Sequence, residues 1–150
     1  ILLILDYSEA FSINMMKFVE LYEKEYQRDL HYIVKPHVNS PIDLRDFEIK
    51  NAVISNDKIE TLLHNSCKCI CSNMTSAQID ALIMQSSVIV ILDGKELNLS
   101  PLKGLEAASF VSTLKELDEA LINSPEGLKE GVASDFFFHN NKLTRWKKYI

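Results

Sequence analysis

The fold is decided by the segment Cys67-Lys-Cys-Ile-Cys-Ser-Asn-Met-Thr-Ser-Ala-Gln-Ile-Asp-Ala-Leu-Ile-Met-Gln-Ser-Ser-Val-Ile-Val-Ile-Leu92. Residues 67–72 and 87–92 are short apolar runs of the kind that form buried strands. Residues 75–84 between them have the length and pattern of a helix. A strand, a helix and a second strand in this order predict two parallel strands joined by a crossover helix.

The same alternation continues on both sides of this unit. Further strands are predicted at residues 1–6, 31–35, 52–54 and 109–111, and further helices at residues 8–26, 58–65 and 114–122. Residues 39–50 are predicted to be a loop because Pro41 interrupts any regular pattern. Six strands with intervening helices predict an α/β fold, a three-layer α/β/α Rossmann-like domain with a mostly parallel six-stranded sheet of order 3-2-1-4-5-6.

Polar residues stand where the predicted helices begin, and such residues commonly cap a helix through their side-chain oxygen. The candidate caps are Ser8 for the first helix, Asn56 or Asp57 for the second, and Ser112 or Thr113 for the last.

Composition excludes several classes of protein. The chain has 150 residues, of which 47% are hydrophobic and 25% charged, and its formal net charge is −5. This acidic balance argues against a whole-domain role on nucleic acid, which requires a basic face. No apolar run approaches the roughly 20 residues of a membrane helix, and no secretory signal is visible.

Three cysteines, Cys67, Cys69 and Cys71, alternate along the fourth predicted strand. In a strand they would all point to one face, with neighbours roughly 6.5 Å apart, which is too wide for two ligands of one zinc ion. We therefore expect reduced core cysteines and no metal site, as in a cytoplasmic protein. A metal or redox role is the alternative.

Ligands of doubly wound sheets bind outside the carboxyl ends of the strands, so the turns there hold the candidate site. Thr75 and Ser76 begin the helix after the fourth strand, where free backbone N–H groups and two hydroxyls suit a phosphate. Asp80 follows one turn later and its carboxylate can accept a hydrogen bond from a ribose hydroxyl. The alternative is that Thr75 or Ser76 only caps the helix and Asp80 favours its dipole.

Two more candidates lie at the same edge. His37 follows the second strand, and Pro36 fixes the turn that aims the imidazole over the edge of the sheet, where it can contact a phosphate or a base. The alternative is a loop histidine with no ligand. Ser8, in the first strand-to-helix turn, is a candidate ligand contact as well as a cap. This turn, Asp6-Tyr7-Ser8-Glu9, lacks glycine, which disfavours a nicotinamide or flavin dinucleotide. The sequence also has no P-loop, nucleophile elbow or His-Glu-x-x-His pattern.

The motif Lys35-Pro36-His37 and the stretch Thr75-Ser76-Ala77-Gln78-Ile79-Asp80-Ala81-Leu82, placed before Val88-Ile89-Val90, resemble the C-terminal half of GT-B-fold glycosyltransferases. The most similar members are bacterial surface-polysaccharide transferases, including the sialyltransferase and glycerophosphotransferase types. Phe110-Val111-Ser112 with Leu114-Lys115-Glu116-Leu117 is similar to the closing strand and helix of that family. The resemblance spans residues 1–122, with short motifs.

This resemblance implies a function and a role for each matching residue. His37 would contact the donor phosphate or nucleotide, Thr75 and Ser76 would bind phosphate, and Asp80, in place of the usual Glu, would face the ribose. The substrate would be a nucleotide-activated sugar, with no permanently bound cofactor. The sequence departs from the motifs of that family at two places. Val38 stands in place of a second Pro, and Gln85-Ser86-Ser87 stands in place of the Gly-x-Pro that precedes the strand.

The resemblance also sets the expected domain organisation. Residues 1–135 form the Rossmann-like nucleotide-binding domain, and residues 136–150 form a basic, aromatic helix that packs on it or on an N-terminal domain. Because the chain opens inside an apolar strand without Met, we expect that N-terminal domain upstream, with the acceptor site and the catalytic base. The isolated domain would then be inactive, and its uncovered surface would allow a homodimer.

The C-terminal stretch leaves alternatives open. Four basic residues surround Trp146, and the stretch lacks acidic residues. It suits a peripheral membrane contact at the inner face of the cell membrane, a helix that packs on a partner domain, or a solvated terminus.

A different class of protein is a non-enzymatic module, either receiver-like or another Rossmann-like binding domain. A receiver-like domain is also doubly wound and needs acidic residues after its first and third strands and a lysine after its fifth. Asp6, Asp57 and Lys95 stand at such positions. However, Leu5 occupies the place of a second acidic residue, and six strands are one too many.

Overall fold

The structure is a computed structural model that describes residues 1–94 and 97–123. The predicted helix at residues 136–150 and the residue Lys95 lie outside the described residues.

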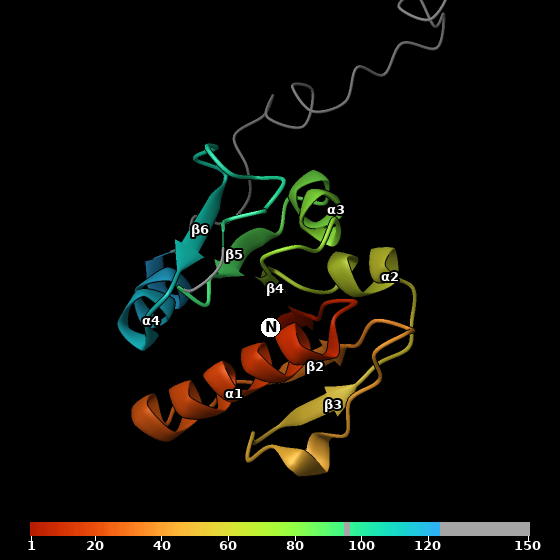
Figure 1. Ribbon diagram of the computed structural model, residues 1–150, viewed down its shortest axis with the longest axis vertical. Helices are drawn as coiled ribbons and strands as arrows, with labels where there is room; N and C mark the ends of the chain where they lie inside the picture. Colours follow the sequence, from red (N-terminus) through yellow and green to blue (C-terminus); the bar gives the residue numbers. More distant parts are fainter. Residues whose placement is uncertain (95–96, 124–150) are drawn as a thin grey trace, which may run out of the picture.

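One six-stranded parallel sheet organises the described chain (Figure 1). Its strands are β1 (Leu2–Ile4), β2 (Tyr32–Lys35), β3 (Ala52–Ile54), β4 (Lys68–Ser72), β5 (Ser87–Ile91) and β6 (Ala108–Val111). They lie in the order β3-β2-β1-β4-β5-β6, and every neighbouring pair is parallel. The predicted fold class and strand order are therefore confirmed. The receiver-like alternative is wrong, since doubly wound receivers have the order 2-1-3-4-5.

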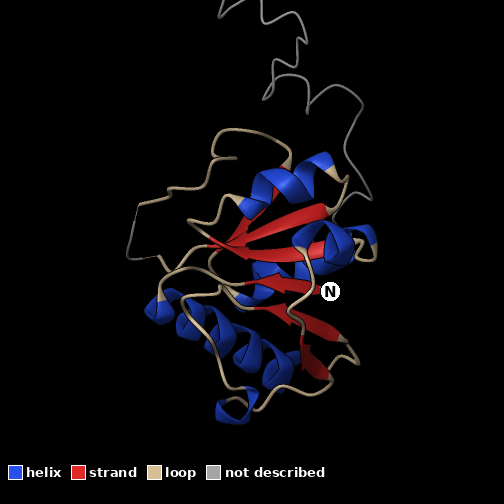
Figure 2. Cartoon of the chain, turned by 90° about the vertical axis from the view of Figure 1, so that its right-hand side faces the viewer, coloured by secondary structure: helices blue, strands red, loops and turns tan. Residues whose placement is uncertain are grey.

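Helices cover both faces of the sheet, as Figure 2 shows. The helices are α1 (Glu9–Tyr26), α2 (Ile59–His64), α3 (Ala77–Ile83) and α4 (Leu114–Asn123), and a short 3₁₀ helix, η1 (Leu44–Asp46), lies in the predicted loop. Residues of α1 and α4 share one buried cluster with one face of the strands, and α2 and α3 share a second cluster with the other face. The three-layer arrangement explains why the central strands are apolar on both sides.

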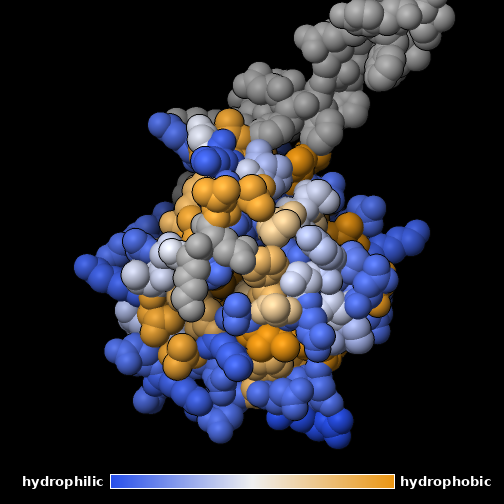
Figure 3. Space-filling model, in the orientation of Figure 1, coloured by the Kyte–Doolittle hydropathy of each residue, from blue (hydrophilic) through white to orange (hydrophobic). Residues whose placement is uncertain are grey.

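Alternate residues of each central strand enter opposite layers of the core. Leu3, Ile70 and Ile89 pack under α1 and α4, and their neighbours Cys71 and Val90 pack under α2 and α3. All five side chains are fully buried. The face seen in Figure 3 has mostly hydrophilic residues around its rim and more hydrophobic ones toward its centre.

The helix starts differ in part from the predictions. Ser8 stands at the N-cap of α1, but its side chain makes no capping bond. The Asp6 carboxylate accepts from the Ser8 N–H at 2.9 Å. At α2 the N-cap is Lys58, so neither Asn56 nor Asp57 caps that helix. Asp57 is held instead by the Ser55 hydroxyl, at 3.0 Å.

The last helix confirms its predicted start. Thr113 Oγ1 accepts from the Glu116 N–H at 3.2 Å, and the Glu116 carboxylate accepts from the Thr113 N–H at 3.0 Å. This reciprocal capping box satisfies N–H groups that the first turn leaves free. Its hydrogen bonds with Ser112 and Thr113 lower the pKa of the Glu116 carboxyl.

Only two of the three cysteines belong to the core. Cys69 and Cys71 are buried on the α2 and α3 side, whereas Cys67 precedes β4 and is exposed. The prediction that all three are core residues is therefore wrong for Cys67, because the strand begins one residue later than expected. Burial raises the pKa of the Cys69 thiol to about 11, which keeps it protonated at neutral pH.

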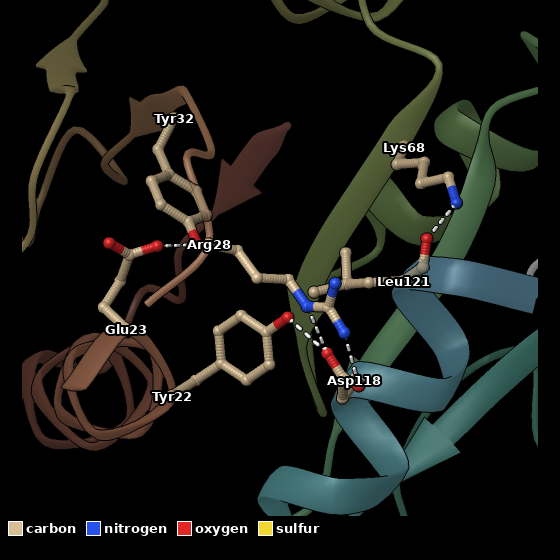
Figure 4. A network of polar contacts seen from close by, with 7 residues as sticks. All are labelled: Tyr22, Glu23, Arg28, Tyr32, Lys68, Asp118 and Leu121. Carbon is tan, nitrogen blue, oxygen red and sulfur yellow. Dashed lines mark hydrogen bonds and ion pairs between the residues drawn. The ribbon is translucent and has the colours of Figure 1, made fainter. Parts of the chain in front are cut away.

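A network of polar contacts holds the helix layer near the amino ends of the strands (Figure 4). Asp118 of α4 accepts from the Tyr22 hydroxyl at 2.8 Å and from Arg28 Nε and a terminal nitrogen at 2.6 and 2.8 Å. The Tyr32 hydroxyl donates to Glu23 at 2.8 Å. These bonds join α1 to α4 and to β2. Burial and the neighbouring carboxylates raise the pKa of both tyrosines.

Candidate functional site

The carboxyl ends of all six strands lie at one edge of the sheet because every strand is parallel to its neighbours. The strand order reverses direction between β1 and β4, the place where doubly wound sheets bind ligands. The turns after β1, β2, β4 and β5 therefore form the candidate site.

A buried carboxylate joins the two strands at this reversal. Asp6, after β1, is 1% exposed, and its two oxygens accept from Ser72 Oγ of β4 at 2.5 Å and from the Ser8 N–H. Its backbone exchanges two further hydrogen bonds with the Ser12 hydroxyl, at 3.1 and 3.0 Å. Because both carboxylate oxygens are used inside the fold, Asp6 positions the turn rather than offering itself to a ligand.

The polar contacts continue from β4 into α3. The buried amide of Gln78 donates to the Ser72 carbonyl at 2.6 Å and accepts from Ser100 Oγ at 2.5 Å. These bonds fix the start of α3 and the segment before β6 against the end of β4. Sequence reasoning missed both Gln78 and Ser100, which become partners only when the chain folds.

A cavity of about 220 Å³ opens between α1 and the ends of β4 and β5. Its walls are Phe11, Asn14, Met15 and Phe18 of α1, with Ser72, Asn73, Ile91 and Asp93. The Asn73 side chain is held in place, since it donates to the Leu97 carbonyl at 2.8 Å and accepts from the Leu99 N–H at 3.0 Å. The cavity therefore has one apolar helical wall and one polar wall of strand ends.

His37 lies at the end of β2, as predicted, and touches a residue that the sequence analysis did not select. Its ring stands edge-on to Tyr7, with centroids 6.5 Å apart and planes at 74°. His37 Nδ1 accepts from the Asn39 N–H at 3.2 Å, so in the neutral ring the proton resides on Nε2. That N–H can donate to an anionic or carbonyl oxygen of a ligand.

The predicted phosphate and ribose contacts lie on and before α3. Ser76 stands at the N-cap without a side-chain capping bond and is exposed, whereas Thr75 Oγ1 accepts from the Ala77 N–H at 3.3 Å. Asp80 is one turn further, and partial burial together with Glu60 of α2 raises the pKa of its carboxyl. In the described chain no hydrogen bond joins His37 to Thr75 or Ser76, so these remain separate parts of one edge.

Two further classes of feature are absent from residues 1–94 and 97–123. No three His, Cys, Asp or Glu side chains gather there in a way that could hold a metal ion. In the same residues, no helix has the length and apolar character needed to cross a membrane.

Comparisons with known proteins support the fold. No family model and no curated protein matches the sequence. Among solved structures, the chain is similar to the UDP-GlcNAc 2-epimerase of Methanocaldococcus jannaschii, crystallised with UDP-GlcNAc and UDP, with a TM-score of 0.61 and 15% identity. The match covers 99% of this chain and 45% of the epimerase chain. This chain therefore has the fold of a segment that makes up less than half of that epimerase chain.

Proposed function

We propose that this chain is the nucleotide-sugar-binding domain of a larger enzyme. The observation that carries the proposal is that nearly the whole chain superposes on less than half of an enzyme whose crystals hold UDP-GlcNAc and UDP. The cavity at the carboxyl ends of β4 and β5 supports it, because this edge is where such sheets bind nucleotides.

In finer terms, we propose the donor-binding C-terminal domain of a glycosyltransferase or polyol-phosphate transferase of bacterial surface-carbohydrate synthesis. The motif with His37 and the stretch from Thr75 to Asp80 support this choice. A cytoplasmic location agrees with the free cysteines Cys69 and Cys71. The acceptor and the catalytic base would come from another domain, so the isolated chain would bind the donor without transferring it.

The proposed roles of the residues at the carboxyl ends of the strands follow from the hydrogen-bonding groups that each can offer to a ligand. When the bond from sugar to phosphate breaks, negative charge grows on the leaving phosphate oxygens. The His37 Nε2–H and the Ser76 hydroxyl would donate to those oxygens, and they would stabilise the departing nucleotide more than the bound donor. Thr75 and Ser8 would position the phosphates, and the Asp80 carboxylate would accept from the ribose hydroxyls.

A titration of the 150-residue chain with CMP, CDP, UDP and GDP tests the proposal. We expect saturable binding of one nucleotide by isothermal titration calorimetry, and a loss of affinity of about tenfold or more in both His37→Ala and Ser76→Ala. The exposed variant Lys17→Ala serves as the control and should bind like the wild type. Failure of all four nucleotides to bind would overturn the proposal in favour of a non-enzymatic Rossmann-like module.

A further inference from the structure

Tyr7, in the turn after β1, is an aromatic side chain that the fold leaves uncovered. It is 58% exposed, and among residues 1–94 and 97–123 no other Phe, Tyr or Trp side chain is exposed. Because β1 lies between β2 and β4, Tyr7 stands where the strand order reverses, which is the place where doubly wound sheets bind their ligands. The ring is therefore available to a ligand at that place.

Hydrogen bonds fix the turn on both sides of Tyr7. The Asp6 carboxylate accepts from Ser72 Oγ at 2.5 Å and from the Ser8 N–H at 2.9 Å. The backbone of Asp6 also exchanges two hydrogen bonds with the Ser12 hydroxyl. A ligand that stacks on the Tyr7 ring therefore meets a turn that is already ordered, and binding loses little entropy in ordering it.

His37, after β2, forms a corner with the Tyr7 ring. The two ring centroids are 6.5 Å apart and the ring planes meet at 74°, which is the edge-to-face arrangement of an aromatic pair. This contact holds the Tyr7 side chain on one side and leaves more than half of it exposed. A flat ring can stack on the uncovered part of Tyr7 while the His37 Nε2–H donates to an oxygen of the same ligand.

The polar groups around Tyr7 favour a nucleobase over a sugar ring as the stacked group. The Asp6 carboxylate oxygens, the Ser12 hydroxyl and His37 Nδ1 already take part in hydrogen bonds inside the fold. A sugar ring carries several hydroxyls, and their removal from water is costly without hydrogen-bond partners. A base needs no such partners to stack, since every base has a π-face.

The place of Tyr7 at this edge also agrees with the predicted phosphate contacts. Neighbouring strands are about 4.8 Å apart, so Tyr7 lies one strand away from β2 with His37 and one strand away from β4, which leads to Ser76. Ser76 is exposed and makes no side-chain capping bond. A nucleotide whose base lies on Tyr7 can therefore extend its phosphates toward the Ser76 hydroxyl.

We propose that Tyr7 stacks on the nucleobase of the ligand, and that the phosphates extend from there toward Ser76. The inference rests on the proposed function for the presence of a nucleotide. It goes beyond that function by assigning the base to a residue that the sequence analysis did not select as a ligand contact.

Calorimetry with CMP, CDP, UDP and GDP tests the stacking. In Tyr7→Leu we expect the affinity for the nucleotide that binds to fall about tenfold, because the ring is lost. Tyr7→Phe keeps the ring and should bind within twofold of the wild type. The control is Leu21→Ala, which removes a 54% exposed apolar side chain of α1 and should leave the affinity unchanged. Equal melting temperatures of Tyr7→Leu and the wild type show that the contact is lost and not the fold.

Proton NMR of the ligand reports the stacking directly. A base above a tyrosine ring lies in its ring current, so H5 and H6 of a pyrimidine, or H8 of guanine, should move upfield on binding. The upfield shift should vanish in Tyr7→Leu and persist in Tyr7→Phe. The same spectra are recorded with the matching sugar nucleotide, which is UDP-GlcNAc, GDP-mannose or CDP-glucose. Upfield shifts of its sugar protons in place of its base protons would overturn the inference.

Two further results would overturn the inference while leaving the proposed function intact. They are an unchanged nucleotide affinity in Tyr7→Leu, and base protons that do not move upfield on binding. A separate arm covers the case in which no nucleotide binds. The chain is then titrated with uridine, cytidine and guanosine while the ring protons of Tyr7 are followed by NMR. A saturable shift there would keep the stacking site and reject only the proposed function, and no shift would reject both.

Discussion

Near the amino ends of the strands, Tyr22 and Arg28 share the Asp118 carboxylate, whereas at the carboxyl ends the Asn14 amide and the Ser76 hydroxyl take part in no hydrogen bond among the described residues. Both regions are rich in polar side chains. In the first, the partners are supplied by the fold itself, so the groups hold helices together. In the second, the polar groups face outward without such partners, and a ligand can supply the missing hydrogen bonds.

Asp6 shows that position alone does not separate the two kinds of residue. It lies at the carboxyl edge, yet both its oxygens are bonded within the fold. By its bonding it belongs with Asp118 rather than with His37. The difference between the two regions is therefore one of unused hydrogen-bonding capacity.

The largest effect on stability is expected from Asp6→Ala. The change leaves the buried Ser72 hydroxyl and the Ser8 N–H without their acceptor, which should lower the free energy of unfolding by about 3 kcal/mol. Urea denaturation measures it. The control is Asp57→Ala, an exposed carboxylate after β3, for which we expect a change within about 0.5 kcal/mol. Equal effects of the two variants would contradict the structural role of Asp6.

A smaller effect is expected from Tyr32→Phe. Loss of the hydroxyl leaves the buried Glu23 carboxylate without its donor and should cost about 2 kcal/mol of unfolding free energy. Tyr7→Phe is the matched control, because the exposed Tyr7 makes no hydrogen bond through its hydroxyl in the described chain. If thermal or urea unfolding ranked the two variants the other way, the account of the amino-end contacts would be wrong.

Acid should weaken the contact between α1 and α4. Hydrogen bonds from Arg28 lower the pKa of the Asp118 carboxyl below its unfolded value of about 3.9. The ionised form therefore stabilises the fold, fully above that unfolded pKa, and this contribution is lost as the pH falls through the folded pKa. Between pH 5 and pH 2 the wild type should lose more stability than Asp118→Asn. Parallel pH profiles for the two proteins would show that the ion pair does not contribute.

The smallest effects on stability are expected from His37→Ala and Ser76→Ala. Neither side chain supplies a bond that holds two elements together. Each substitution should therefore change the free energy of unfolding by no more than about 0.5 kcal/mol, with a correspondingly small change in melting temperature. Differential scanning calorimetry without ligand measures this. A large destabilisation in either variant would move that residue from the ligand-binding group to the structural one.

The order and type of the strands could be predicted from sequence because they depend on local patterns. A buried strand such as β5 is a short apolar run, and its partner strands are set by the alternation with helices. The residues that cap the helices are harder to predict from the sequence. Ser8 has the residue type and position of a cap, yet its side chain makes no capping bond, and the Asp6 carboxylate two residues earlier binds the Ser8 N–H. Whether a side-chain oxygen reaches the N–H groups of the first turn depends on its rotamer in the folded chain, which the sequence does not specify.

The candidate site could be predicted only where it consists of single turns. The sequence selects His37 and Ser76 as candidates because each follows a predicted strand end, and their ligand-binding roles stay predictions. The cavity was not found, because Phe11 and Asn14 meet Asn73 and Asp93 only after α1 folds back over β4 and β5. Long-range polar partners such as Gln78 with Ser100 are missed for the same reason. Their spacing along the chain carries no periodic signal.

The most direct test of the central claim is an NMR map of where the chain responds to ligand. Amide shifts are recorded during titration with UDP and UDP-GlcNAc, and with whichever other nucleotide binds by calorimetry. The account predicts shifts at the carboxyl edge, at Tyr7, His37, Asn73 and Ser76, with the amides of Arg28, Tyr32 and Asp118 unchanged. Shifts centred on Arg28 and Asp118, or no shift at either end, would contradict it.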